Sequence, residues 1–192
     1  MDGKIRCWGG PQIFIDYHDF EWGRPVRDDK KFFEMLTLES MQSGLSWITV
    51  LNRREAFREA FDGFDFYKVA AYGEKKIEEL MSNEKIIRNR LKILAAINNA
   101  AMFVKIAESH GSFSDFIWSY FGGVPLQGYI ENEGWVPKTK LSEKISKDLK
   151  KLGFKFVGPT TVYSFMQATG LVNDHTPECF LYGEISREGE QK

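Results

Sequence analysis

Apolar residues recur along most of the chain every three or four positions, the spacing of one helix face. Sustained alternation of apolar and polar residues, typical of half-buried strands, is missing. The stretch 122–140, with four glycines and two prolines, predicts an irregular connection that could hold a short hairpin. The pattern therefore predicts an all-α protein. The clearest apolar stripe predicts a long helix over 84–107, with Ile86, Ile93, Leu94, Ile97, Ala101 and Val104 on one face. Two later stripes predict two more helices, one with Leu141, Ile145, Leu149 and Leu152 and one with Val162, Phe165, Met166 and Thr169.

A carboxylate falls on the apolar face of one predicted helix. The segment from Asp29 to Gln42 predicts a helix with an aspartate at its N-cap. Phe32, Leu36 and Glu39 follow the spacing i, i+4, i+7, so Glu39 lies on the same face as the two apolar residues. One interpretation is a capping or salt-bridged glutamate at the domain edge. The other is a pocket carboxylate that hydrogen-bonds a ligand, since an unpaired buried glutamate is rare.

Length and composition fit a single folded domain. At 192 residues we expect one domain over 1–183, followed by a disordered tail over 184–192. Hydrophobic residues at 43% exclude a disordered chain, and a net charge of -1 gives no overall signal for polyanion binding. The N-terminus resembles no signal peptide, and no apolar run is long enough to span a bilayer. We expect a cytoplasmic monomer that does not contact membranes.

Four of the five cysteines and histidines gather in two short segments at opposite ends of the chain. His175 and Cys179 lie four residues apart, and ten residues separate Cys7 from His18. Two cysteines and two histidines form a ligand set that structural zinc sites use, closed and without a position for an activated water. Such a site would join the two ends of the chain. The alternative is a pair of buried cysteines with two hydrogen-bonded histidines, and spacing alone leaves it open.

The segment Leu152–Thr160 lies between two amphipathic helices and predicts a hairpin at 153–158. Gly153 and Gly158 allow a tight turn with exposed backbone N–H groups, and Pro159 suits the first position of the next helix. A helix-hairpin-helix of this kind can hold a nucleic-acid phosphate at a helix N-terminus. Residues 138–155 carry seven lysines against two acidic residues, which favours the same contact. A solvated lysine-rich helix face beside an ordinary turn is the alternative.

Three of the five tryptophans fall within the first 47 residues, close in sequence to Glu39. They are Trp8, Trp22 and Trp47, and Phe14 and Tyr17 lie among them. Many of these rings would be expected in the core, which is the default for Phe14. Planar faces beside one buried carboxylate would also suit a flat, electron-poor ring, held by stacking and by hydrogen bonds from ring N–H groups.

These residues also form the motifs of a known family. The segments resemble the 3-methyladenine DNA glycosylase I family, and they run in the family's order from residue 7 to residue 179, over nearly the whole chain. The matching motifs are Cys7-Trp8, Tyr17-His18-Asp19-x-Glu21-Trp22-Gly23, Leu38-Glu39-x-x-Gln42-x-Gly44-Leu45-Ser46-Trp47, Gly153-Phe154-Lys155-Phe156-Val157-Gly158-Pro159-Thr160 and Asn173-Asp174-His175.

The resemblance implies a helix-hairpin-helix DNA glycosylase fold whose two ends are joined by structural zinc. It implies a base-excision repair enzyme that hydrolyses the N-glycosidic bond of 3-methyladenine in alkylated double-stranded DNA. It implies that Glu39 recognises the base and that Trp47, Tyr17, Trp8 and Trp22 wall the pocket. The further positions that it implies are the zinc ligands Cys7, His18, His175 and Cys179 and the DNA contacts Gly44, Leu45, Gly153, Lys155, Gly158 and Thr160.

The resemblance also bears on the chemistry. Methylation at N3 gives adenine a positive charge and weakens its glycosidic bond, so flipping the nucleotide into the pocket is the main requirement. Bifunctional relatives place a Schiff-base lysine just after the hairpin, whereas this chain has Thr160, so we expect an abasic product and no strand cleavage. Where some relatives have tyrosine this chain has Phe14, and its hydroxyl contact is absent. We expect Asp174 to orient a zinc ligand, and the group that positions the water stays open.

Two other classes of protein fit part of the pattern. A non-catalytic, zinc-stabilised DNA-binding module could use the same hairpin without releasing a base. A thiol redox protein could use Cys7 and Cys179, and it would bind no metal. Base release separates the enzyme from the module, and elemental analysis separates the metal protein from the redox protein.

Overall fold

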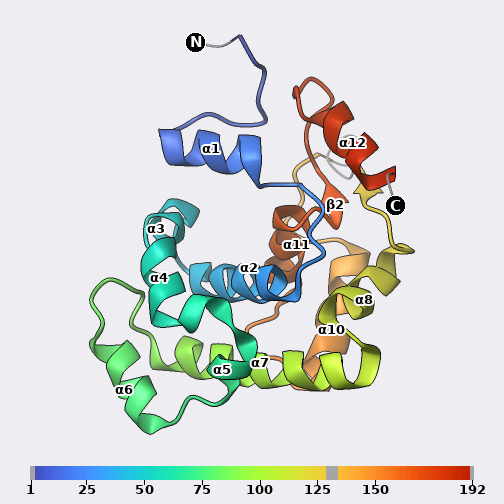
Figure 1. Ribbon diagram of the computed structural model, residues 1–192. Helices are drawn as coiled ribbons and strands as arrows, with labels where there is room; N and C mark the ends of the chain where they lie inside the picture. Colours follow the sequence, from blue (N-terminus) through green and yellow to red (C-terminus); the bar gives the residue numbers. More distant parts are fainter. Residues whose placement is uncertain (1–2, 129–133, 191–192) are drawn as a thin grey trace.

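The computed structural model describes residues 3–128 and 134–190. The described chain is built from helices, and the helical prediction is confirmed (Figure 1). None of its helices is long and apolar enough to cross a membrane. The first half contains α1 (Gln12–Phe20), α2 (Asp29–Gln42), α3 (Trp47–Leu51), α4 (Arg54–Ala60), η1 (Asp62–Phe64), α5 (Phe66–Ala70) and α6 (Glu74–Ser82). The second half contains α7 (Arg90–His110), α8 (Phe113–Trp118), η2 (Ser119–Phe121), β1 (Leu126–Gln127), α10 (Lys140–Leu152), α11 (Pro159–Ala168), β2 (Val172–Asn173) and α12 (Tyr182–Glu190).

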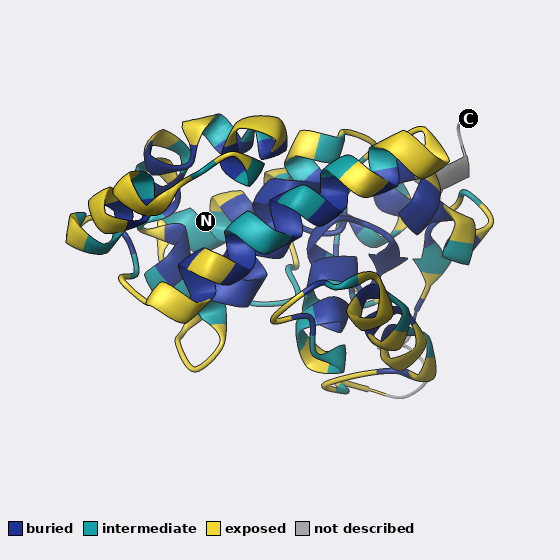
Figure 2. Ribbon diagram, turned by 90° about the horizontal axis from the view of Figure 1, so that it is seen from below, coloured by how far each residue is buried: buried dark blue, intermediate teal, exposed yellow. Residues whose placement is uncertain are grey.

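Helix α2 lies in the middle of the molecule and organises the core (Figure 1). Its predicted bounds are confirmed, and the Asp28 side chain caps it by accepting from the backbone N–H of Lys31 at 2.7 Å. Every residue from Phe32 to Met41 is buried, because α3, α7, α8 and α11 pack around the helix. Viewed from below, exposed residues lie on the outer faces of the surrounding helices (Figure 2). A side chain between Phe32 and Met41 therefore lies in the protein interior, whatever its polarity.

The long helix α7 differs from its prediction at both ends. It runs from Arg90 to His110, whereas the pattern predicted 84–107. Asn89 caps it by accepting from the N–H of Lys92 at 3.2 Å, which fixes the start six residues later. The buried face also differs, since Leu94 is 39% exposed while Ala96 is buried. The buried alanines of α7, Ala95, Ala96 and Ala100, allow close packing of the helix against its neighbours.

The connection between α8 and α10 contributes β1 to a parallel strand pair, and the short hairpin considered for this stretch stays a prediction. Leu126 pairs with Val172 and Gln127 with Asn173 in a parallel two-stranded sheet of β1 and β2. Parallel strands need a long crossover, and here α10 and α11 supply it. Residues 129–133 of the predicted irregular stretch lie outside the described residues.

The C-terminal segment forms a helix where a disordered tail over 184–192 was expected. Helix α12 runs from Tyr182 to Glu190, and residues 191–192 lie outside the described residues. Leu181 and Ile185 are fully buried and pack with Cys179 in a small apolar cluster. Their spacing of four residues supplies one apolar helix face, and burying it orders the segment.

Candidate functional site

Glu39 lies on α2 at the wall of a cavity of about 390 Å³. Its side chain is buried, with 6% of the residue exposed, and among the described residues its carboxylate forms no hydrogen bond or ion pair. Burial raises the pKa of Glu39 from its usual 4.5 to about 8. The interpretation of Glu39 as a capping or salt-bridged glutamate at the domain edge is therefore wrong. Its predicted location at the wall of a pocket is confirmed.

Aromatic rings line the same cavity, as the sequence predicted. Trp8, Tyr17, Trp22 and Trp47 all reach it, and Phe14 joins them although it was assigned to the core by default. The rings of Tyr17 and Trp47 are tilted by 53° with centroids 5.4 Å apart, and those of Trp8 and Trp22 meet edge to face at 4.4 Å. The indole Nε1 atoms of Trp8 and Trp47 are buried and have no hydrogen-bond partner among the described residues. The cavity therefore combines flat apolar walls with one carboxylate.

The buried phenol of Tyr17 completes the polar side of the cavity. Burial, and then the charge of Glu39, raise the pKa of Tyr17 well above its usual 10.0. The hydroxyl therefore remains neutral at physiological pH and can donate a hydrogen bond.

Several cavity residues were not predicted as site residues. They come from four separate parts of the chain, and only Gly9 directly follows a predicted wall residue, Trp8: Gly9, Gln42, Trp135, Ser164 and Gln167. Trp135 is 61% exposed, so it lies at the edge of the cavity. Gln42 follows Glu39 by three residues on α2, and the helical spacing could have indicated that it shares the face of Glu39. The other residues become neighbours only through the packing of α11 and the α8–α10 connection.

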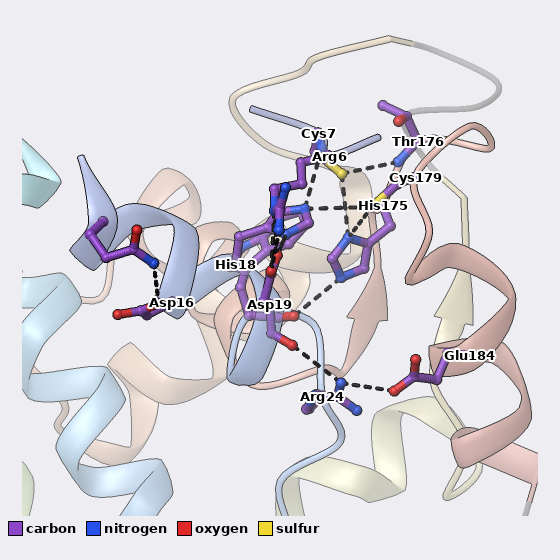
Figure 3. A network of polar contacts seen from close by, with 12 residues as sticks. Arg6, Cys7, Asp16, His18, Asp19, Arg24, His175, Thr176, Cys179 and Glu184 are labelled. Carbon is purple, nitrogen blue, oxygen red and sulfur yellow. Dashed lines mark hydrogen bonds and ion pairs between the residues drawn. The ribbon is translucent and has the colours of Figure 1, made fainter. Parts of the chain in front are cut away.

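The four predicted metal ligands come together between the two ends of the chain (Figure 3). One ligand atom from each of Cys7, His18, His175 and Cys179 lies within 4.8 Å of all the others. Sγ of Cys7 is 3.3 Å from Nδ1 of His175, and Sγ of Cys179 is 3.4 Å from the same nitrogen and 3.5 Å from Nε2 of His18. Cys7 and His18 lie 150 or more positions before His175 and Cys179 in the sequence. The cluster could hold a metal ion.

The outer nitrogens of the two imidazoles have their own partners (Figure 3). Nδ1 of His18 is 2.8 Å from Asp19, whose carboxylate also accepts from Nε and Nη2 of Arg6 at 2.9 and 2.7 Å. Nε2 of His175 is 3.2 Å from the carbonyl oxygen of Trp22. Partners of this kind fix the ring orientation of metal-binding histidines. The carboxylate of Asp174, which was expected to orient a zinc ligand, accepts from Tyr163 and Gln167, and its orienting role stays a prediction.

The cluster and the cavity share a wall. The ring of His18 lies 4.9 Å from Trp8, and that of His175 lies 4.6 Å from Trp22, both edge to face. Gly23 permits this packing, because a Cβ there would lie 2.8 Å from Nε2 of His175, and its φ of +79° suits glycine. Any interaction that orders the four residues of the cluster therefore also fixes Trp8 and Trp22, which line the cavity.

Burial controls protonation inside the cluster. It raises the pKa of Cys7 to about 12, with the neighbouring Cys179 adding to the effect. It lowers the pKa of His175 to about 4, and the charge of His18 lowers it further. The imidazole is thus neutral, as a metal ligand must be, whereas a thiolate needs a nearby cation to form. A thiol with a raised pKa is a poor nucleophile, which disfavours the thiol redox protein.

A buried ion-pair network braces the segment that carries Tyr17 and Trp22. Arg54 on α4 donates to Glu21 at 2.5 and 2.7 Å and to Glu34 on α2 at 2.8 Å, and Lys31 donates to Glu21 at 2.8 Å. Burial alone raises the pKa of Glu21, but the hydrogen bonds and charges of Arg54 and Lys31 outweigh it and lower that pKa to about 2. The network fixes the end of α1 against α2, on which Glu39 lies.

The two predicted DNA-contacting turns have the expected backbone. Gly44 has a φ of +80° just beyond the end of α2, and Leu45 beside it is 42% exposed. Gly153 ends α10 in the left-handed conformation, Gly158 is the N-cap of α11, and Pro159 occupies its first turn. The predicted hairpin positions are therefore confirmed as a turn between two packed helices.

The turn at 153–158 exposes backbone donors and an apolar side chain. Phe156 has a φ of +55° and is 40% exposed, an uncommon conformation for a residue other than glycine. No hydrogen bond is present, among the described residues, for the N–H groups of Phe156, Val157 and Gly158. Lys155 and Thr160 are exposed beside them. Free amides at a helix N-terminus can bind an anion.

The lysines of 138–155 are only partly neutralised. Lys138 pairs with Glu143, while Lys144 and Lys151 lie near Asp148. Lys147, Lys150 and Lys151 line one hollow together with Pro159, at the start of α11. Exposed ion pairs of this kind contribute little, so the surface beside the turn remains positive.

The family comparison agrees with this geometry. A model of the methyladenine glycosylase family matches residues 8–182. The chain belongs to the methyladenine glycosylase family. It is 48% identical over 177 residues to the DNA-3-methyladenine glycosylase of Haemophilus influenzae, covering 91% of this chain and 96% of that one. It is also 48% identical over 171 residues to DNA-3-methyladenine glycosylase 1 of Escherichia coli, with 88% and 91% covered.

Solved structures of family members share the fold. A crystal structure of 3-methyladenine DNA glycosylase I superposes with a TM-score of 0.88 at 46% identity and covers 93% of this chain and all of that one. The Staphylococcus aureus enzyme, solved to show the structural basis of 3-methyladenine recognition, has a TM-score of 0.86 at 40% identity, with 91% and 93% covered. The resemblance read from the motifs is therefore confirmed, and so is the all-α fold of this family.

Proposed function

We propose that this family member is a DNA glycosylase that removes 3-methyladenine from alkylated double-stranded DNA and leaves an abasic site. One observation carries the proposal, namely the unpaired, buried carboxylate of Glu39 in a cavity walled by four predicted aromatic residues. An unpaired buried carboxylate is costly, so its retention calls for a ligand that uses it. A flat cationic base fits both the carboxylate and the walls.

The proposed reaction is hydrolysis of the N-glycosidic bond. The methylated base is already positively charged, so it can leave without a strong general acid. Glu39 and the rings of Trp47 and Tyr17 bind and orient the flipped cationic base. As the bond to C1′ breaks, its electron pair passes to the base, which leaves as neutral 3-methyladenine, and the positive charge moves to the sugar. Water then adds to C1′ of the oxocarbenium-like sugar, loses a proton and leaves the abasic sugar. Thr160 stands where bifunctional relatives have a lysine, which supports hydrolysis without strand cleavage.

DNA engages through the two turns. Gly44 and Leu45 lie just beyond the helix of Glu39, where an exposed leucine can occupy the gap left by the extruded nucleotide. The N–H groups of residues 156–158 and the side chains of Lys155 and Thr160 bind backbone phosphates, as expected of a helix-hairpin-helix.

We infer that the cluster of Cys7, His18, His175 and Cys179 holds a structural Zn²⁺. Bond lengths of roughly 2.1 Å to nitrogen and 2.3 Å to sulfur place tetrahedral N and S ligands about 3.5 Å apart. The N···S distances of 3.3, 3.4 and 3.5 Å fit that geometry. Burial raises the pKa of the Cys7 thiol, so a nearby cation would favour its thiolate, which supports the same inference. All four ligands come from the protein, so the ion would supply stability and no activated water.

We also propose a monomer that acts in the cytoplasm, where free cysteines such as Cys7 and Cys179 stay reduced.

Chromatography of the products from methylated duplex DNA tests the activity. We expect free 3-methyladenine and DNA with an intact strand that breaks only after alkaline treatment. The alternative, a non-catalytic zinc-stabilised DNA-binding module, predicts binding to the same duplex and no free base. Release of no 3-methyladenine would overturn the proposed enzyme.

The ionisation of Glu39 predicts a pH dependence of base excision. Its pKa of about 8 means that the carboxyl is largely protonated at pH 6 in the free protein. A cationic base binds the carboxylate more tightly than the neutral acid, so kcat/KM should rise with pH up to about 8 and then level off. Single-turnover rates between pH 6 and 9 measure this profile. A rate that is flat over this range would show that Glu39 does not interact electrostatically with the base.

A further inference from the structure

Helix α7 contacts the end of α2 through a buried lysine that the base-excision mechanism does not use. Nζ of Lys92 donates to the carbonyl oxygens of Met41 at 2.8 Å and Ser43 at 2.6 Å. Lys92 is 7% exposed, and its charge lies against the carbonyl end of α2, where a cation is favourable. These bonds fix the backbone from which the Gly44–Leu45 turn departs.

The same helix holds the second turn. Nδ2 of Asn99 donates to the carbonyl oxygen of Lys155 at 2.9 Å, and Oδ1 of Asn99 accepts from the N–H of Lys155 at 2.8 Å. Asn98 donates to the carbonyl oxygen of Gly153 at 2.8 Å. Asn99 is 3% exposed, so its two bonds are shielded from water.

Side chains from other helices bind two further carbonyls of this turn. Ser40 on α2 donates to Phe156 at 3.4 Å, and Ser146 on α10 donates to Val157 at 2.6 Å. Four carbonyl groups of the turn are thus bound by side chains of the protein, while the N–H groups of 156–158 are left for a ligand. The clamp by Asn99 thereby also sets which side of the turn can bind an anion.

Lys92 and Asn99 lie on one face of α7, seven residues apart. Seven residues correspond to two helical turns and a rise of about 10.5 Å. We propose that α7 acts as a rigid spacer which sets the separation between the Gly44–Leu45 turn and the turn at 153–158, with Lys92 and Asn99 as positioning residues. This inference rests on the proposed function, since it assumes that both turns contact the same DNA.

A fixed spacing matters because the DNA is itself stiff. A protein that must occupy the gap left by a flipped nucleotide and bind a backbone phosphate gains from both contacts only when their separation matches the duplex. Two turns that move independently would lose the benefit of preorganisation. The free base, by contrast, contacts only the cavity, which contains none of the α7 residues. DNA binding and free-base binding should therefore respond differently to changes on α7.

The experiment compares Lys92→Met and Asn99→Leu, which remove the polar clamps at nearly constant side-chain size. Lys105→Met is the matched control, because Lys105 is an exposed lysine of α7. Three quantities are measured for each variant: affinity for a duplex with a stable abasic-site analogue, kcat/KM on methylated duplex, and affinity for free 3-methyladenine from tryptophan fluorescence. Binding of the analogue duplex needs no catalysis. A wild-type protein that binds this duplex but releases no base from methylated DNA would contradict the proposed function and leave the spacer unaffected.

We expect both variants to lose about tenfold in duplex affinity and in kcat/KM, with free-base affinity within about twofold of wild type. Lys105→Met should match wild type in all three measurements. Duplex affinity that is unchanged, or free-base affinity that falls in parallel with it, would overturn the spacer. If Asn99→Leu does not fold, Asn98→Ala removes the bond to Gly153 and a longer one of 3.3 Å to Oδ1 of Asn99 from a half-buried site. It should lower duplex affinity about threefold and leave free-base affinity unchanged, and equal losses in both would again overturn the proposal.

Discussion

Glu39→Gln is expected to raise the stability of the protein at pH 8 and to lower the rate of base excision about 100-fold. The native state holds a proton on Glu39 with a pKa of about 8, whereas the unfolded chain has the usual 4.5. Between these values the native state binds more protons, so the free energy of unfolding falls as the pH rises. At about 1.4 kcal/mol for each pKa unit, up to about 5 kcal/mol is lost from pH 4.5 to 8.

Glutamine does not titrate. The gain in free energy of unfolding of Glu39→Gln over wild type should therefore be small at pH 4.5 and largest near pH 8. Urea unfolding at several pH values measures it. Glu34→Gln is the matched control on the same helix, because Glu34 is equally buried but accepts from Arg54 and Arg58. Breaking that pair should cost about 3 kcal/mol. A Glu39→Gln variant less stable than wild type at pH 8 would mean that Glu39 has a structural partner.

Removal of the metal is expected to lower the melting temperature by about 10 °C and to weaken binding of 3-methyladenine. The proposed site closes a loop of more than 170 residues, and losing it should cost about 3–5 kcal/mol, which for a chain of this size corresponds to that shift. The pocket should suffer too, since His18 and His175 pack against Trp8 and Trp22.

Thermal unfolding with and without a strong chelator measures the effect, and elemental analysis should find about one zinc per chain. Cys179→Ser should have the low melting temperature without chelator and respond to it no further. A wild type with no bound metal, or with the same melting temperature in chelator, would contradict the zinc site. Cys7 and Cys179 would then be ordinary buried thiols.

Local sequence rules succeeded where the chain acts locally. The aspartate cap and the spacing of Phe32, Leu36 and Glu39 indicated both the bounds of α2 and the unusual position of the carboxylate. Gly153, Gly158 and Pro159 indicated the turn between α10 and α11, because each conformation is restricted by its own residue type.

What the sequence left out depends on contacts between distant segments. The pairing of β1 with β2 and the bonds of Arg54 to Glu21 and Glu34 join residues that no periodicity relates. Trp135 reaches the cavity only because the chain returns to it. The metal cluster was the exception, since cysteine and histidine are so few that their grouping could be read without the fold. Spacing alone left it open, and the family motifs and then the geometry brought the four residues together.

The most direct test of the account is the single-turnover release of 3-methyladenine from methylated duplex DNA by wild type and by Glu39→Gln. The account places the cationic base against the Glu39 carboxylate, so wild type should release the free base and Glu39→Gln should do so about 100-fold more slowly, although it is folded and more stable. Equal release rates for the two proteins, or no free 3-methyladenine from wild type, would contradict it.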